Sequence, residues 1–150
     1  MAQKAVGASP VTLRGDHVLV DTGILVALFN RSDSWHGAAT AWLARCEANL
    51  HTVEPVLSET SFFLPPAQRA ALADLAAAGT IRVHATSAAG FKRIGAILRK
   101  FASLDPDWAD ASLVCCAEEN GIHRVATLDV RDFSAYRIHG RSKFQLEPLT

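Results

Sequence analysis

The sequence predicts an α/β fold with a mainly parallel central sheet, and three observations support that prediction. Patterns typical of strands and of helices alternate along the 150 residues. The first strand, "HVLV" at 17–20, is β-branched and apolar on both faces, as a buried parallel strand is. No linker, repeat or low-complexity segment divides the chain, whose length suits one domain with a real core. We therefore expect an α/β sandwich, because such alternation packs helices against a parallel sheet.

Residues that cap or interrupt helices mark the boundaries of the other elements. Ser34 is the expected N-cap of one helix. Pro65 and Pro66 stop another, because proline does not continue a helix. Gly79 and Gly121 stand just past the ends of two more, where glycine is favoured. In chain order we expect a helix over 22–30, a helix over 34–49, a strand over 50–55, a helix over 56–64, a helix over 67–79, a strand over 80–85, a helix over 87–104, a helix over 105–121, a strand over 122–129 and a strand over 143–148.

Composition limits the class of protein. The chain is 49% hydrophobic and 20% charged, which is typical of a globular protein. Its 15 basic residues balance 15 acidic ones, which argues against a protein held on nucleic acid purely by bulk charge. It has 3 cysteines, and the odd number favours buried thiols in a reducing compartment over a disulfide framework.

Neither a membrane span nor a signal peptide is expected. No apolar run approaches the ~20 residues that cross a bilayer. The stretch 1–16 lacks the continuous apolar core of a signal peptide. We therefore expect 1–16 to be a flexible N-terminal extension and 17–150 to be a single folded domain. The protein is expected to be cytoplasmic, with no membrane partner.

Four acids stand in apolar surroundings where a core pattern would not place them. Asp21 and Asp129 each end an expected strand, whereas Glu59 and Asp110 lie within apolar helical segments. Taken singly, each has a structural interpretation as an N-cap, a first-turn acid, a turn residue or a solvent-facing side chain. Taken together, two of them end parallel strands, and ligands bind beyond the carboxyl ends of the strands in such folds.

A cation would explain why such acids gather. Carboxylates brought close together repel one another, and a divalent ion removes that repulsion. All-oxygen ligation favours Mg²⁺ or Mn²⁺ over zinc, since no cysteine–histidine cluster with ligand spacing is present. Such ions activate water and stabilise charge on a phosphate, so the pattern predicts metal-dependent phosphodiester cleavage. Neither a G-x-S-x-G elbow nor a phosphate-binding loop supports a different chemistry.

The order of these motifs resembles the PIN domain and, within it, the VapC-type ribonuclease toxins of bacterial toxin–antitoxin pairs. The resemblance is carried by "VLVDTG", "EPVLSETSFFL", "DWADASLVCCAEENGIHRVATLD" and "RDF", over roughly residues 17–147. The most specific part is "ADASLV" followed by a strand ending in "TLD". The resemblance implies a three-layer α/β/α sandwich and an endoribonuclease, dependent on Mg²⁺ or Mn²⁺, that cleaves RNA with a metal-activated water.

The resemblance also implies roles for the acids, which together form the expected catalytic and metal-binding set. Asp21 and Asp110 would be the main metal ligands. Glu59 would complete the cluster, directly or through water. Asp129 would hold a second metal or orient the attacking water. All four positions are occupied here, so nothing in the sequence marks the site as inactive.

Neighbouring polar residues are assigned lesser roles. The hydroxyls of Thr22 and Thr127 are expected to fix water or to orient the carboxylates. Whether Asp107 or Asp132 joins the site stays open, because Asp107 suits a helix N-cap and Asp132 is expected at the rim. Asp33 is interpreted as a surface residue.

The implied partners are an RNA substrate, a cognate antitoxin whose C-terminal segment covers the active site, and a second copy of the chain in a homodimer. We expect part of "SFFLPPAQ" at a protein interface, since it is very apolar for a helix end. Candidates for phosphate contact are Arg31, Lys92, Arg93, Arg99, Lys100, Arg131 and Arg137.

Three other functions are alternatives to a toxin nuclease. One is a PIN-fold RNA-processing nuclease that is not a toxin. Another is a catalytically silent PIN-fold binding module, which the complete acid set disfavours. A signalling receiver domain also gathers acids around Mg²⁺, but "TIRVHA" lacks the phosphoacceptor aspartate that would end its third strand. The RNA target, the number of metal ions and the identity of the antitoxin stay open.

Overall fold

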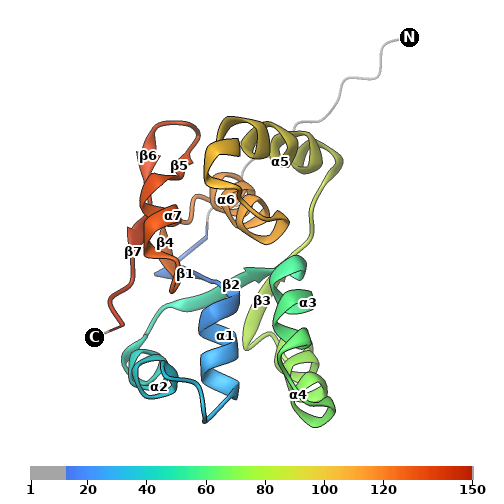
Figure 1. Ribbon diagram of the computed structural model, residues 1–150, viewed down its shortest axis with the longest axis vertical. Helices are drawn as coiled ribbons and strands as arrows, with labels where there is room; N and C mark the ends of the chain where they lie inside the picture. Colours follow the sequence, from blue (N-terminus) through green and yellow to red (C-terminus); the bar gives the residue numbers. More distant parts are fainter. Residues whose placement is uncertain (1–12, 150) are drawn as a thin grey trace.

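A parallel sheet runs through the middle of the molecule in the computed structural model, which describes residues 13–149 (Figure 1). Its strands lie in the order β3-β2-β1-β4-β7, and each neighbouring pair is parallel. The central strand β1 is flanked on both sides, and Val18, Leu19 and Val20 are fully buried. This burial is the reason for its apolar character on both faces. The strands are β1 (His17–Val20), β2 (Asn49–Val53), β3 (Ile81–His84), β4 (Arg124–Ala126) and β7 (Gln145–Leu146).

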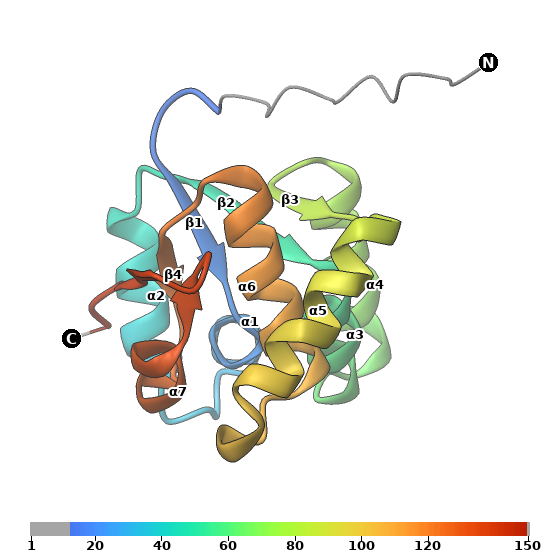
Figure 2. The same cartoon turned by 90° about the horizontal axis from the view of Figure 1, so that it is seen from above.

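Helices cover both faces of this sheet, which confirms the α/β/α sandwich. In Figure 1, α5 and α6 lie above the strands, and α1 to α4 lie below them. Figure 2 shows α5 and α6 side by side, as their mutual packing requires. The helices are α1 (Thr22–Phe29), α2 (His36–Arg45), α3 (Glu54–Phe62), α4 (Pro66–Ala77), α5 (Ala88–Lys100), α6 (Trp108–Asn120) and α7 (Val130–Ala135), with a 3-10 turn at Ala102–Leu104.

Helix α6 is the most deeply buried helix of the described chain. Every residue from 109 to 117 is buried, because the helix packs against β2, α3 and α5. A helix that is apolar all round suits such a position. Cys115 and Cys116 lie on it as free thiols, and burial raises the pKa of each to about 12. The expectation of buried thiols in place of a disulfide framework is confirmed for these two residues, whereas Cys46 is free and half-buried.

Two elements after β4 were not expected from the sequence. Helix α7 occupies six residues, and a small antiparallel hairpin of β5 (Arg137–Ile138) and β6 (Ser142–Lys143) follows it. Elements this short contain too few residues to show a helical or strand period. Their placement matters, because they stand next to the carboxyl end of β4.

Several expected boundaries were wrong. The N-cap of α2 is Trp35 and not Ser34, because the Asp33 carboxylate accepts the Trp35 backbone N–H at 2.8 Å and closes a turn first. Strand β4 ends at Ala126, so Asp129 does not end a strand. It is the N-cap of α7 instead. The helix expected over 87–104 ends at Lys100 and is followed by the 3-10 turn.

Two expectations concern the ends of the chain and membranes. Most of the expected extension 1–16 lies outside the described residues, which begin at 13. Within residues 13–149, no helix is both long enough and apolar enough to cross a membrane.

Candidate active site

A pocket lined by acids opens where the carboxyl ends of β1 and β4 meet. The two strands pair in parallel with Val20 opposite Ala126, and the Asp21 backbone N–H donates to the Ala126 carbonyl at 3.0 Å. Six acidic side chains line the pocket, and no lysine or arginine among residues 13–149 does. The four predicted acids are among them, so the structure brings all four together. The lining acids are Asp21, Asp33, Glu59, Asp107, Asp110 and Asp129.

Asp21 is held rigidly by two hydrogen bonds at the junction of β1 and α1. Its Oδ1 accepts the Thr22 backbone N–H at 2.7 Å, and its Oδ2 accepts the Thr127 hydroxyl at 2.7 Å. The side chain is only 8% exposed, and burial raises its pKa to about 6 despite these bonds. Asp21 is therefore an N-cap and a pocket carboxylate at once, with its orientation fixed before any ligand binds.

Asp110 lies in the first turn of α6 and is equally buried. Its Oδ2 accepts the Tyr136 hydroxyl at 3.0 Å. Burial raises its pKa to about 7, and the nearby charges of Asp107 and Asp21 add to that shift. Without a cation, burial therefore favours the protonated form of this carboxyl.

Glu59 reaches the same pocket from the middle of α3. Its Oε2 accepts the Thr22 hydroxyl at 3.3 Å, which links the start of α1 to α3. Partial burial, followed by repulsion from Asp107, raises the pKa of this carboxyl. Thr22 and Thr127 both bond to site acids, so the structure places these two hydroxyls where the sequence predicted them.

A tight group of three carboxylates forms the other side of the site. Ligand oxygens of Asp110, Asp129 and Asp132 all lie within 4.8 Å of one another. Thr127 helps to place this group, because its hydroxyl accepts the Asp129 backbone N–H at 2.9 Å. Asp132 therefore lies with the site acids, although the sequence left its membership open. Helix α7, which was not predicted from the sequence, carries Asp132 to this position.

Two further acids were assigned structural roles from the sequence. Asp107 is the N-cap of α6, as expected, since its Oδ1 accepts the Asp110 backbone N–H at 2.7 Å. It nevertheless lines the pocket, and its charge raises the pKa of both Asp110 and Glu59. Asp33 also lines the pocket, so its interpretation as a surface residue was incomplete. The sequence signal that could have placed Asp107 in the site was its position as a capping acid directly before the helix of Asp110.

Tyr136 is the residue that sequence reasoning missed altogether. It is fully buried, and its hydroxyl is bonded to Asp110. Nothing in "SAYRIHG" marks a site residue, since the contact depends on how α7 and the hairpin return toward α6.

The residues present fit a hard divalent cation. The side-chain atoms lining the pocket that could bind a metal are carboxylate or hydroxyl oxygens, which Mg²⁺ and Mn²⁺ prefer as ligands. Burial and mutual repulsion raise the pKa values of Asp21 and Asp110, so bringing these charges together is costly without a counter-ion. Within the part of the chain that the structure describes, no basic side chain in the pocket lining supplies one.

Two of the candidate phosphate-binding arginines bond within the protein. Arg93 forms an ion pair with Glu118, and its Nη2 donates to Glu118 Oε2 at 3.0 Å. Arg137 donates from Nη1 to the backbone carbonyls of Ser134, Ala135 and Tyr136. These contacts give both side chains a structural role.

Comparison with known proteins gives a family and a fold. A family model described as PIN domain matches residues 18–138. Among curated proteins, no sequence matches the chain. The crystal structure of VapC20 from Mycobacterium tuberculosis, described as a toxin that cleaves the sarcin-ricin loop, is similar, with a TM-score of 0.73 and 24% identity over 79% of this chain and 94% of that chain. The structure of VapBC2 from Rickettsia felis, bound to a DNA fragment from its promoter, is also similar, with a TM-score of 0.62 and 13% identity over 88% of this chain and 99% of that one.

Proposed function

Because this chain belongs to the PIN-domain family, we propose that it is a metal-dependent endoribonuclease and the toxin of a type II toxin–antitoxin pair. The observation that carries the proposal is the pocket at the carboxyl edge of the sheet, which six acids and no basic side chain of the described residues line. Such a pocket repels a phosphodiester by itself. It becomes a phosphate site only when cations neutralise it, which is the behaviour of a metal-dependent nuclease.

We assign the cation to the buried carboxylates. Asp21 and Asp110 are the proposed main ligands, and Glu59 completes their side of the site. Asp129 and Asp132, which lie close to Asp110, form the other side. Mg²⁺ is the preferred ion and Mn²⁺ the alternative, because the donors are all oxygens.

The bound ion would supply Lewis-acid stabilisation of the scissile phosphate and activation of a water nucleophile. The protein's own part is to hold the acids in place beforehand. Thr127 fixes both Asp21, through its hydroxyl proton, and the backbone of Asp129, through its hydroxyl oxygen. Thr22 fixes Glu59. Preorganisation of this kind avoids the cost of ordering charged groups during the reaction.

An RNA cleavage assay tests the proposal directly. The wild-type protein should cleave RNA in the presence of Mg²⁺ or Mn²⁺ and should stop when EDTA is added. An RNA hairpin carrying the sarcin-ricin loop is one suitable probe, because the VapC20 protein is described as cleaving that loop. Total RNA serves as the second substrate.

Matched variants make the assay specific. Asp21→Asn and Asp110→Asn should each reduce the cleavage rate by at least about 100-fold while the far-ultraviolet circular dichroism stays unchanged. Asp74→Asn, an exposed change on α4, should retain the wild-type rate. Full activity in both site variants would reject the proposed function.

RNA cleavage and the effect of expression on bacterial growth together separate the other candidate functions. A catalytically silent binding module would bind RNA without cleaving it under any metal condition. An RNA-processing nuclease would cleave RNA, but its expression in a bacterium would not arrest growth. The toxin role predicts growth arrest on expression, and Asp110→Asn should abolish it. It also implies a cytoplasmic location, where the RNA substrate lies.

The proposed protein partners follow from the toxin role. We propose a cognate antitoxin, supported by the likeness to VapBC2. We also propose a homodimer, supported by the two apolar side chains at the end of α3, where Phe62 is 82% and Phe63 is 63% exposed. Exposed apolar side chains that lie next to each other are typical of protein interfaces.

A further inference from the structure

A buried tyrosine stands directly behind the proposed metal ligands. Tyr136 has no exposed surface, and its hydroxyl lies 3.0 Å from Asp110 Oδ2. A carboxylate that binds a cation is ionised and only accepts, so the tyrosine is the donor of this hydrogen bond when Asp110 serves as a ligand. One oxygen of Asp110 therefore has a donor beside it.

Two aromatic rings pack against the tyrosine ring. Phe101 and Phe133 meet it edge to face, with ring centroids 5.3 and 5.1 Å away. The Tyr136 backbone N–H donates to the Asp132 carbonyl at 2.9 Å, at the end of α7. The hydroxyl consequently points at Asp110 because of packing, and not because the hydrogen bond pulls a mobile side chain into place.

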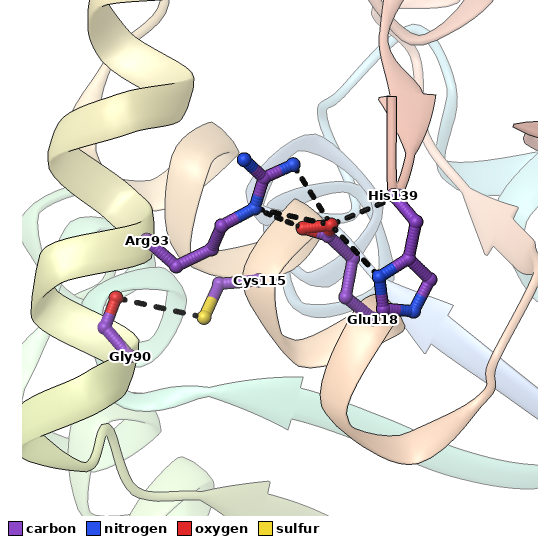
Figure 3. Close-up of polar contacts among 5 residues, drawn as sticks. All are labelled: Gly90, Arg93, Cys115, Glu118 and His139. Atoms are coloured by element: carbon purple, nitrogen blue, oxygen red, sulfur yellow. Dashed lines mark hydrogen bonds and ion pairs between the residues drawn. The ribbon is translucent and has the colours of Figure 1, made fainter. Parts of the chain in front are cut away.

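The segment that follows Tyr136 is fastened to the helix that carries Asp110. Glu118 on α6 accepts the His139 backbone N–H at 2.9 Å and forms an ion pair with Arg93 of α5 (Figure 3). The Glu118 side chain is only 4% exposed, whereas those of Arg93 and His139 are 37% and 64% exposed. A hydrogen bond therefore links the segment after Tyr136 to the helix that carries Asp110.

We propose that Tyr136 is a positioning residue that holds the Asp110 carboxylate in the orientation needed to bind a divalent cation. This inference rests on the proposed metal-dependent function. The bond from Tyr136 takes up Asp110 Oδ2 and prevents the carboxylate from turning, while oxygens of Asp129 and Asp132 remain within 4.8 Å. Tyr136 thus does for Asp110 what the Thr127 hydroxyl does for Asp21.

Calorimetric titration of the metal-free protein with MnCl₂ tests this role. Tyr136→Phe removes the hydroxyl and keeps the buried ring. We expect the Mn²⁺ dissociation constant to rise about tenfold, which is the effect typical of removing a hydrogen-bond partner of a metal ligand. The urea midpoint of the metal-free protein should change little. In cleavage assays, the Mn²⁺ concentration that gives half-maximal rate should rise by the same factor.

Phe144→Leu is the packing control. Phe144 packs on Phe133, with centroids 5.4 Å apart, and therefore supports the same aromatic cluster. This variant should lower the urea midpoint and leave the Mn²⁺ dissociation constant within about twofold of wild type.

The Mn²⁺ affinities of the two variants together decide whether Tyr136 is a positioning residue. Tenfold weaker binding in Tyr136→Phe with normal binding in Phe144→Leu supports the positioning role. Equal losses of affinity in both variants would reduce Tyr136 to a packing residue. Wild-type affinity in Tyr136→Phe would reject the positioning role and leave the proposed nuclease function standing. A wild-type protein that binds neither Mn²⁺ nor Mg²⁺ would overturn both.

Discussion

Individual carboxylates in this site both cap a helix and line the pocket, two roles that a sequence pattern presents as alternatives. Asp21 accepts the Thr22 backbone N–H as an N-cap and also faces the acidic pocket. Asp107 and Asp129 cap α6 and α7 in the same way. A helix N-terminus stabilises a negative charge, so capping offsets part of the free-energy cost of bringing several acids together at one edge of the sheet. The N-cap interpretation of an acid is therefore no evidence against a role in the site.

At the residue scale, Asp110 makes the stability of the metal-free protein depend on pH. Folding raises its pKa from 3.8 to about 7, so the folded chain binds the proton more tightly than the unfolded chain. Stability contributed by that proton is present at low pH and is lost as the pH rises through this window. From pH 5 to pH 8, wild type should therefore lose about 2 kcal/mol more stability than Asp110→Asn.

Urea unfolding in EDTA at the two pH values measures this difference. Asp74→Asn, on the exposed face of α4, should behave like wild type at both. The prediction fails if Asp110→Asn and wild type lose the same stability between pH 5 and pH 8.

At the scale of elements, a chain of histidines ties three strands together. His51 lies between His17 of β1 and His84 of β3, with ring nitrogens 2.7 and 2.8 Å apart. His17 Nε2 donates to the Arg14 carbonyl, which cannot donate, and this fixes the direction of the whole chain. In the neutral rings, His51 Nε2 donates to His17 Nδ1, and His84 Nε2 donates to His51 Nδ1.

The histidine chain predicts a second, opposite dependence on pH. Burial, followed by the neighbouring rings and Arg82, lowers the pKa of His51 from 6.5 to about 4. The unfolded chain therefore binds this proton more tightly, and stability is lost as the pH falls through that window. Between pH 7.5 and pH 4.5, His51→Leu should lose about 2 kcal/mol less than wild type does.

Denaturant unfolding at both pH values again supplies the measurement. His123→Leu removes an exposed histidine on the loop before β4 and should follow the wild-type curve. Parallel losses in His51→Leu and wild type would show that the buried ring is not the group that titrates.

At the scale of the whole molecule, the proposed cation joins elements that are far apart in the sequence. Its ligands come from the end of β1, from α3, from α6 and from α7. A ligand that binds only the folded state stabilises it, by about 1.4 kcal/mol at ten times its dissociation constant. Mg²⁺ at that concentration should raise the melting temperature by about 3–5 °C at pH 8.

Differential scanning fluorimetry checks this cation effect. The rise should be smaller at pH 6, because protons compete with the ion for Asp21 and Asp110, whose pKa values are about 6 and 7. It should vanish in Asp110→Asn. An equal rise in wild type and in that variant would place the ion elsewhere.

The proposed homodimer is also a property of the whole molecule. Phe62 is 82% exposed in the single chain, so Phe62→Ser should leave the fold of each chain intact. If this side chain lies at the interface, the variant should be monomeric at concentrations where wild type is dimeric. Mass measurement over a concentration series decides this, and a wild-type protein that is monomeric throughout would reject the homodimer.

The sequence by itself determined the fold class and the four acids that share the pocket. Both signals are local, since alternating apolar patterns and a charge inside an apolar run can be read without knowing what packs against them. Only the tertiary structure decided that Asp132 and Tyr136 lie beside Asp110, and that His51 bridges two neighbouring strands. These contacts depend on strand register and on the return path of α7 and the β5–β6 hairpin. Elements of two to six residues have no period that would reveal that path.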